Sequence, residues 1–148
     1  MFKLNKKVEY ALIALVEMSS LDKGEPVTAK MLVEKTDLPK ALLGKILQSL
    51  NRSGIISSVQ GVKGGYHLTR ELKDLQLKEV IEAVEGPVAI ADCFQSDNNC
   101  SDKPYCELKN PLRIIQNDIN RYLMGINLGY IRDLYGKNRE NVNIQVTN

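Results

Sequence analysis

The chain has 148 residues, a hydrophobic fraction of 43% and a formal net charge of +2, values that fit one globular domain or two very small ones. Lysines interrupt the N-terminal residues, and no window approaches the roughly 18 apolar residues of a membrane span, so we expect neither a secretory signal nor a membrane protein. In the cytoplasmic protein that we therefore expect, clustered cysteines indicate metal or redox chemistry more often than disulfides.

The charge is unevenly divided along the chain. Residues 1–70 contain 11 Lys and Arg against 6 Asp and Glu, whereas residues 71–148 contain 9 against 12. The N-terminal half is therefore the half that we expect to contact phosphate groups. Solvated lysines on a small domain would give the same asymmetry, so charge alone leaves both interpretations open.

The first 53 residues predict three helices. Apolar residues recur at helical spacing from about residue 4 to residue 20. Thr28 is a candidate N-cap for a second helix over residues 29–35, and Pro39 suits the first turn of a third helix that ends at Ser53 and Gly54. Residues 36–38 join the last two helices, which predicts a helix-turn-helix whose second helix lies in the major groove.

The outward side of that third helix has residue types that suit DNA. Small residues let the backbone approach the groove, Lys45 and Gln48 can reach base edges, and a lysine and an arginine near the helix ends can reach phosphates. A pair of short helices is nevertheless common in helical domains. The candidate DNA-binding residues on this helix are Lys40, Ala41, Gly44, Lys45, Gln48 and Arg52.

A hairpin follows the third helix. Residues 55–60 and 66–69 read as strands, joined by the glycine-rich turn Gly61-Val62-Lys63-Gly64-Gly65. A hairpin directly after a recognition helix is a wing, in which glycines let the tip lie close to a sugar-phosphate chain while Lys63 supplies charge. The alternative is that Gly64 and Gly65 only close the hairpin.

A long apolar seam occupies the C-terminal part of the chain. Residues 77–84 predict a helix that ends at Gly86 and Pro87, and residues 127–135 a last short helix before a polar tail that we expect to be disordered. Between them, Pro111 either begins or kinks a long helix. Its seam favours a dimer, although it could also pack within one chain. The seam is Leu108, Leu112, Ile115, Ile119, Tyr122 and Ile126, with a second row at Ile114 and Leu123.

All the cysteines lie in one polar loop. Cys93, Cys100 and Cys106 have six and then five residues between them, among Asp, Asn and Ser that offer little to bury. Cysteine thiolates are the usual ligands of iron-sulfur clusters, and the spacing leaves a zinc site and a disulfide switch open as alternatives. Structural zinc usually shows closer cysteine pairs and four clear ligands, and a disulfide switch would leave one cysteine over. A small electron-transfer or thiol-exchange protein would show a C-x-x-C pair or a substrate pocket.

The motifs KVEYALIALVEM at 7–18, SVQGVKGGYHL at 58–68, LKEVIEAVEG at 77–86 and the cysteine loop together resemble the Rrf2 family of bacterial winged-helix transcription regulators. The resemblance reaches to about Tyr135 and implies a mainly α fold: a winged helix-turn-helix with a two-stranded wing, then a long dimerisation helix. The implied divisions are a DNA-binding domain at 1–86, the cysteine loop at 87–107, dimerisation helices at 108–136 and the tail at 137–148.

The same resemblance implies an iron-sulfur cluster, 2Fe-2S or 4Fe-4S, held by Cys93, Cys100 and Cys106. In some members of the family a histidine three residues after the last cysteine is the fourth ligand, and here that position is Lys109. In others an acidic residue of the first helix is donated by the other subunit, and Glu9 stands at that position. A solvated helix carboxylate is the simpler interpretation of Glu9.

The function implied is a DNA-binding transcription regulator, expected to be a repressor and not an enzyme. A homodimer would bind a palindromic double-stranded operator, and the cluster would sense nitric oxide, oxygen or redox state, or iron-sulfur status. On the wing, Gln60 stands where an arginine often enters the minor groove in this family. The alternative is a cofactor-free regulator that senses thiol oxidation.

Overall fold

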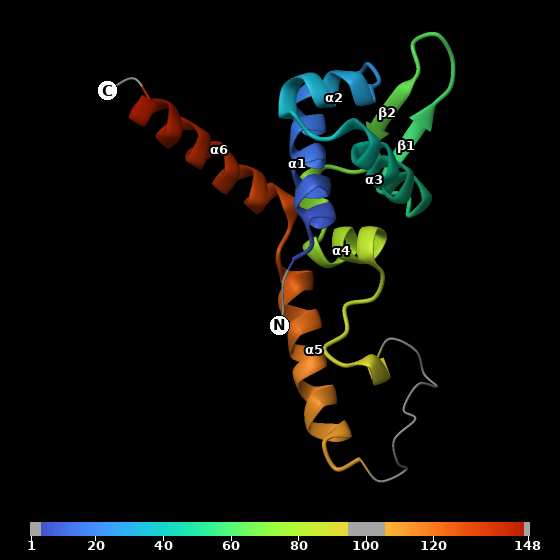
Figure 1. The fold of residues 1–148 in the computed structure, drawn as a ribbon, viewed down its shortest axis with the longest axis vertical. Helices are drawn as coiled ribbons and strands as arrows, with labels where there is room; N and C mark the ends of the chain where they lie inside the picture. The colour runs from blue at the N-terminus through green and yellow to red at the C-terminus, as the bar shows by residue number, and fades with distance from the viewer. Residues whose placement is uncertain (1–3, 95–105, 147–148) are drawn as a thin grey trace.

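The computed structural model describes residues 4–94 and 106–146, so Cys100 lies outside the described residues. In Figure 1 the helices and the hairpin of residues 6–85 form a head. The head stands above α5 (Lys109–Gly125), while α6 (Leu128–Val146) extends away to one side. The described part is mainly helical, as expected. Its elements are α1 (Lys6–Leu21), α2 (Ala29–Thr36), α3 (Lys40–Arg52), β1 (Ile56–Val59), β2 (Gly65–Leu68), the 3-10 turn η1 (Leu72–Asp74), α4 (Leu77–Glu85), the 3-10 turn η2 (Asp92–Phe94), α5 (Lys109–Gly125) and α6 (Leu128–Val146).

Local capping explains where the first helices begin. The Thr28 side chain accepts a hydrogen bond from the Met31 N–H at 3.2 Å, which confirms Thr28 as the N-cap of α2. Asp37 ends α2 in the left-handed region at φ 58°, a conformation that aspartate tolerates better than most residues. Pro39 is the N-cap of α3 rather than part of its first turn. Asp37 and Pro39 thus bound the short connection between the two helices of the expected helix-turn-helix.

Helix α1 lies inside the head and packs on α2, α3, α4, β2 and α6. Ala11 and Ala14 are fully buried, and their small side chains let the neighbouring helices approach. The inward side of α3 meets α1 and is buried, as predicted. Burial of each large apolar side chain stabilises the folded state by roughly 1.5–3 kcal/mol. Those α3 residues are Leu43, Ile46, Leu47 and Leu50.

The hairpin is antiparallel, with register from Ile56 opposite Leu68 to Val59 opposite Gly65. Strand β1 is therefore shorter than the predicted strand at residues 55–60. Strand β2 begins and ends one residue before the predicted strand at residues 66–69. Val27 extends the hairpin by a bridge to Tyr66, with backbone hydrogen bonds of 2.8 and 2.9 Å. The linker between α1 and α2 thereby holds the hairpin against the head.

The C-terminal helices differ from expectation in their limits. Helix α5 begins at Lys109 with Pro111 in its first turn, where a missing amide costs least. Helix α6 continues to Val146, so the tail expected to be disordered from residue 137 is helical to that point. Gly136 lowers helix propensity there, but no proline follows to end the helix.

No helix among the described residues is long and apolar enough to cross a membrane.

Two neighbouring residues of α3 test this packing. Leu47 is fully buried, whereas Gln48 points outward and is exposed. We expect Leu47→Ala to lower the free energy of unfolding by about 2–5 kcal/mol because it leaves a cavity. Gln48→Ala should change it by about 0.5 kcal/mol or less. Urea unfolding at one protein concentration measures both, and equal losses would contradict the inward placement of Leu47.

Candidate DNA interface and cysteine site

The outward side of α3 is exposed and basic. Lys40, Lys45 and Arg52 are exposed together with Ala41 and Gln48, whereas Gly44 is half-buried. Positions 41, 45, 48 and 52 fall three or four residues apart, so their side chains lie on one face of the helix. The structure therefore brings the α3 residues proposed for DNA onto one accessible surface.

The hairpin lies beside the end of α3 (Figure 1), because only Ser53 to Ile55 separate α3 from β1. Gln60 and Lys63 are exposed, and Val62 projects fully into solvent between them. The other two predicted wing residues have a packing reason: a Cβ on Gly64 would lie 2.6 Å from the Val59 carbonyl oxygen, and one on Gly65 would lie 2.8 Å from that of Val27.

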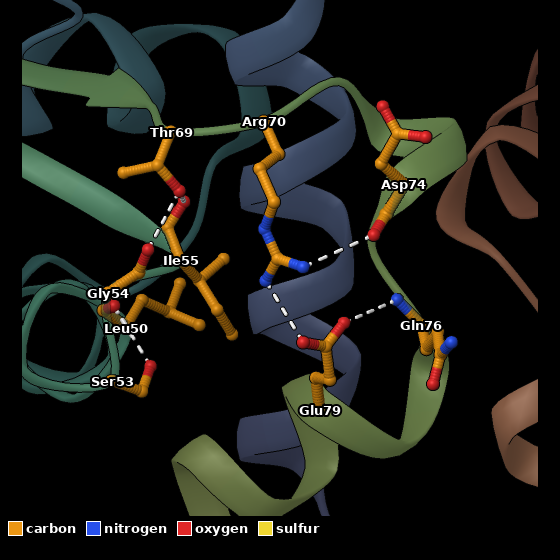
Figure 2. Close-up of polar contacts among 9 residues, drawn as sticks. All are labelled: Leu50, Ser53, Gly54, Ile55, Thr69, Arg70, Asp74, Gln76 and Glu79. Carbon is orange, nitrogen blue, oxygen red and sulfur yellow. Dashed lines mark hydrogen bonds and ion pairs between the residues drawn. The ribbon is translucent and has the colours of Figure 1, made fainter.

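A polar network below the hairpin joins three elements (Figure 2). The Thr69 hydroxyl, just past β2, lies 2.7 Å from the Gly54 carbonyl oxygen and 2.9 Å from that of Ile55, at the end of α3. Arg70 is the next residue, and its guanidinium donates to Glu79 of α4 at 3.0 Å and to the Asp74 carbonyl at 3.3 Å. Consecutive residues of the chain thus tie the hairpin to α3 and to α4.

Glu79 has two partners at the start of α4. Its carboxylate accepts the Gln76 N–H at 2.9 Å as well as the Arg70 guanidinium. Burial by itself raises the pKa of Glu79, but the hydrogen bonds from Gln76 and Arg70 outweigh it and hold the pKa below its ordinary value of 4.5. The sequence offered one signal for this contact, since Gln76 with Glu79 three residues later is a capping-box pattern.

The described cysteines lie at the two ends of the cysteine loop. Cys93 is half-buried in η2, and Cys106 is exposed just before α5, where its carbonyl accepts the Lys109 N–H at 3.1 Å. Among the described residues no three His, Cys, Asp or Glu side chains are grouped closely enough to hold a metal ion. Because Cys100 lies outside them, the predicted ligand set stays a prediction.

Gln116 of α5 holds the segment that leads to Cys93. Its side chain is buried, accepting the Ile90 N–H at 2.8 Å and donating to the Val88 carbonyl at 2.7 Å. A buried amide with both ends bonded is stabilising, whereas an unpaired one is costly. We did not predict this residue, although a glutamine inside the apolar row of Leu112 and Leu123 was a signal for it.

Glu9 lies in the first turn of α1, where its carboxylate pairs with Lys6 at 2.6 Å. The neighbouring Val8 packs with Leu123, near the last turn of α5, whereas Cys106 precedes the first turn. Figure 1 shows these two ends of α5 far apart. At about 1.5 Å per residue, a helix of 17 residues separates them by roughly 20–25 Å, so Glu9 and Cys106 of one chain do not share a site.

The predicted apolar seam of α5 is divided between two surfaces. Leu108, Ile115 and Tyr122 are exposed at 63%, 49% and 72%, while Ile119 and Ile126 of the same seam are half-buried and pack with Leu123 inside the chain. In the second row Leu123 is buried and Ile114 is exposed. Ile115 and Tyr122 line a shallow, mostly apolar groove of about 520 Å³. The row of residues seven apart therefore lies on the surface of this chain.

This chain is similar to known transcriptional regulators in sequence and to solved structures in fold. The model of the Rrf2 family, described as iron-dependent transcriptional regulators, matches residues 4–133. NsrR of Bacillus subtilis, an HTH-type transcriptional regulator, is 28% identical over 95% of this chain and 94% of its own. The HTH-type regulator IscR of Vibrio atlanticus is 26% identical over 99% and 86%. The structure of CymR, the global cysteine regulator of B. subtilis, covers 90% of this chain and 98% of its own with a TM-score of 0.68 at 21% identity, a likeness of fold.

Acid should weaken the contribution of Glu79. Its ionised form, favoured by the lowered pKa, stabilises the fold above the ordinary value of 4.5, and this contribution is lost as the pH falls through the lowered value. We therefore expect wild type to exceed Glu79→Gln in stability at neutral pH by about 1 kcal/mol or less, since both partners are partly exposed, and the difference to shrink on acidification. Urea unfolding between neutral pH and pH 3 measures it; a difference independent of pH would contradict the assignment.

Proposed function

Because the chain belongs to the Rrf2 family of transcriptional regulators, which are not enzymes, we propose that an iron-sulfur cluster on its cysteine loop controls its binding to a DNA operator. The observation that carries this proposal is the placement of the two described cysteines. Cys93 follows a segment that Gln116 pins to α5, and Cys106 stands just before the first turn of the same helix. One rigid helix thus holds both ends of the loop.

The outward side of α3 reads the operator. Lys45 and Gln48 stand at the middle of the exposed face and reach base edges, while Lys40 and Arg52 near its ends contact phosphates. The hairpin contacts the neighbouring sugar-phosphate backbone of the DNA through Lys63, and Gln60 lies on the same hairpin. The basic N-terminal half of the chain matches this role, since neutralised phosphates supply most of the affinity.

A second copy of the chain covers the exposed row of α5. Leu108, Ile115 and Tyr122 recur every seven residues, the spacing of helices that pack along their length. A two-fold axis pairs the same surface of both subunits. We propose that the two-fold axis runs perpendicular to α5, so that the two helices pair antiparallel. The dimer then presents two reading heads, each made of the α2–α3 helix pair and the hairpin of one subunit, to the two halves of a palindrome.

The donor chemistry of the loop suits an iron-sulfur cluster. Cysteine thiolates are its usual ligands, and Cys93 and Cys106 are both free thiols with access to solvent. The fourth ligand is not supplied by Lys109, which has no free electron pair while it is protonated. A 2Fe-2S and a 4Fe-4S cluster are both compatible with three thiolates and one other ligand.

Antiparallel pairing of α5 gives Glu9 a way to complete the site. Within one chain Glu9 lies near the end of α5 opposite Cys106, but antiparallel helices place the end of one beside the start of the other. Glu9 of the other subunit then approaches the cysteines of this chain. A carboxylate among thiolates makes one iron more open to nitric oxide or oxygen, which suits a sensor.

The bound cluster would tie Cys93, Cys100 and Cys106 to one point and so order the loop. Ordering the loop biases the position of α5, and with it the spacing of the two reading heads on DNA. We infer a repressor whose signal is nitric oxide, oxygen or redox state, or iron-sulfur status.

Substitution of Lys45 and of Lys63 distinguishes a contact to bases from a contact to phosphates. We expect Lys45→Ala to weaken binding to an operator by about 1–3 kcal/mol and to flatten the preference over nonspecific duplex. Lys63→Ala should weaken binding to both DNAs alike. It should also lower the slope of the logarithm of affinity against the logarithm of salt concentration by about one, the value for one phosphate contact. Fluorescence anisotropy at several salt concentrations measures both. Equal loss on specific and nonspecific DNA for Lys45→Ala would remove it as a base reader.

Anaerobic purification tests the cofactor. We expect a coloured protein that contains iron and acid-labile sulfide, and Cys→Ser changes at positions 93, 100 and 106 should each abolish the colour. A colourless protein would favour the cofactor-free thiol sensor.

Glu9→Gln tests the fourth ligand in the same preparation. We expect a changed absorption spectrum and cluster loss at least several-fold different in rate on exposure to nitric oxide. Lys6→Gln is the matched control, because it removes the ion pair of Glu9 and leaves the carboxylate. An unchanged spectrum and rate in Glu9→Gln would exclude Glu9 as a ligand.

A further inference from the structure

Helix α4 connects the cysteine loop to the reading head. After its C-terminal end come Gly86 and the segment that Gln116 holds on α5, which leads to Cys93. At its N-terminal end Glu79 receives the guanidinium of Arg70. Because α4 is a single helix of nine residues, its two ends keep a fixed distance.

The hairpin is anchored on two sides. Toward α1, the carboxylate of Asp22 lies 3.1 Å from the His67 Nδ1 and accepts the Leu68 N–H at 3.4 Å. Toward α3 and α4, the anchors are the adjacent residues Thr69 and Arg70. The second anchor fixes the hairpin and the end of the recognition helix in position relative to α4.

The direction of the Arg70 side chain separates it from the residues that contact DNA. In Figure 2 its guanidinium extends from the end of the hairpin toward Glu79 of α4, whereas the side chain of the preceding Thr69 is directed toward Gly54 just past α3. Its two hydrogen bonds go to the Asp74 carbonyl and the Glu79 carboxylate in the region of α4. A forked guanidinium with two acceptors fixes an orientation, which a single ammonium contact does not.

We propose that Arg70 is a positioning residue for operator binding, which sets the hairpin and the end of α3 against α4 without touching DNA. Exposed ion pairs contribute little to stability, so a stabilising role accounts poorly for a fork that spans two elements. Base contacts in a groove depend on where the recognition helix and the wing lie relative to each other, which is what the Thr69-Arg70 anchor fixes. This inference rests on the DNA-binding part of the proposed function.

The test compares two ion pairs of α4, one that reaches another element and one that stays within the helix. Arg70→Gln removes the contact between elements, and Lys78→Gln removes the pair of Lys78 with Glu82 at 2.8 Å, which lies within α4 alone. The probe is a palindromic duplex that the full-length wild-type protein enriches from random DNA. Affinity is measured over a series of salt concentrations, and thermal unfolding is followed alongside.

We expect Arg70→Gln to weaken operator binding about tenfold with an unchanged salt slope, and Lys78→Gln to leave both unchanged. Glu79→Gln keeps the acceptor for the Gln76 N–H and should reproduce the loss, and the double variant should bind no more weakly than Arg70→Gln. Glu79→Gln also serves if Arg70→Gln fails to fold. Where wild type shows different affinities with and without the cluster, Arg70→Gln should bring them closer.

Three results would overturn the inference. A salt slope lowered by about one contact would make Arg70 a phosphate contact instead. Unchanged operator affinity in both Arg70→Gln and Glu79→Gln would show that the anchor does not position the reading head. Additive losses in the double variant would mean that the two residues act separately. Failure of wild type to enrich any duplex would instead overturn the proposed function, and this inference with it.

Discussion

Burial of α1 from several sides is the constraint on which the rest of the structure depends. Its alanines let α2, α3 and α4 pack closely around one helix, and α3 and α4 also carry residues of the proposed function. The outward face of α3 is exposed because the inward residues Leu43, Ile46, Leu47 and Leu50 are buried in the core with α1. The same packing places the start of α1 against α4 and the end of α5, through Val8, Leu77 and Leu123.

The features that could be predicted from the sequence are those with a short period or a local cap. Apolar spacing separated the inward and outward sides of α3, and Thr28 marked the start of α2. The contacts of Gln116 and Arg70 could not be read this way, because neither produces a periodic pattern. Gln116 joins residues far apart in the sequence, and Arg70 reaches Glu79 across an irregular segment. The length of α6 was also missed, since a lone glycine is weak evidence for a helix end.

Polar side chains take over where the chain lacks regular structure. Gln116 bonds one N–H and one carbonyl of the Val88–Ile90 segment, the groups that a neighbouring strand would otherwise bond. Between the hairpin and two helices, Thr69 bonds the carbonyls of Gly54 and Ile55, and Arg70 bonds the Asp74 carbonyl and the Glu79 carboxylate. Both contacts border α4, so the candidate cysteine site and the candidate DNA interface are joined by one short helix rather than by a continuous sheet.

The separation of Glu9 from Cys106 along α5 has a genetic consequence. If each site combines cysteines of one subunit with the carboxylate of the other, a subunit defective in Glu9 and a subunit defective in a cysteine place both defects in the same site of a mixed dimer. The second site of that dimer is then intact, although neither defective homodimer has one. Two recessive alleles of this kind would complement each other within one gene.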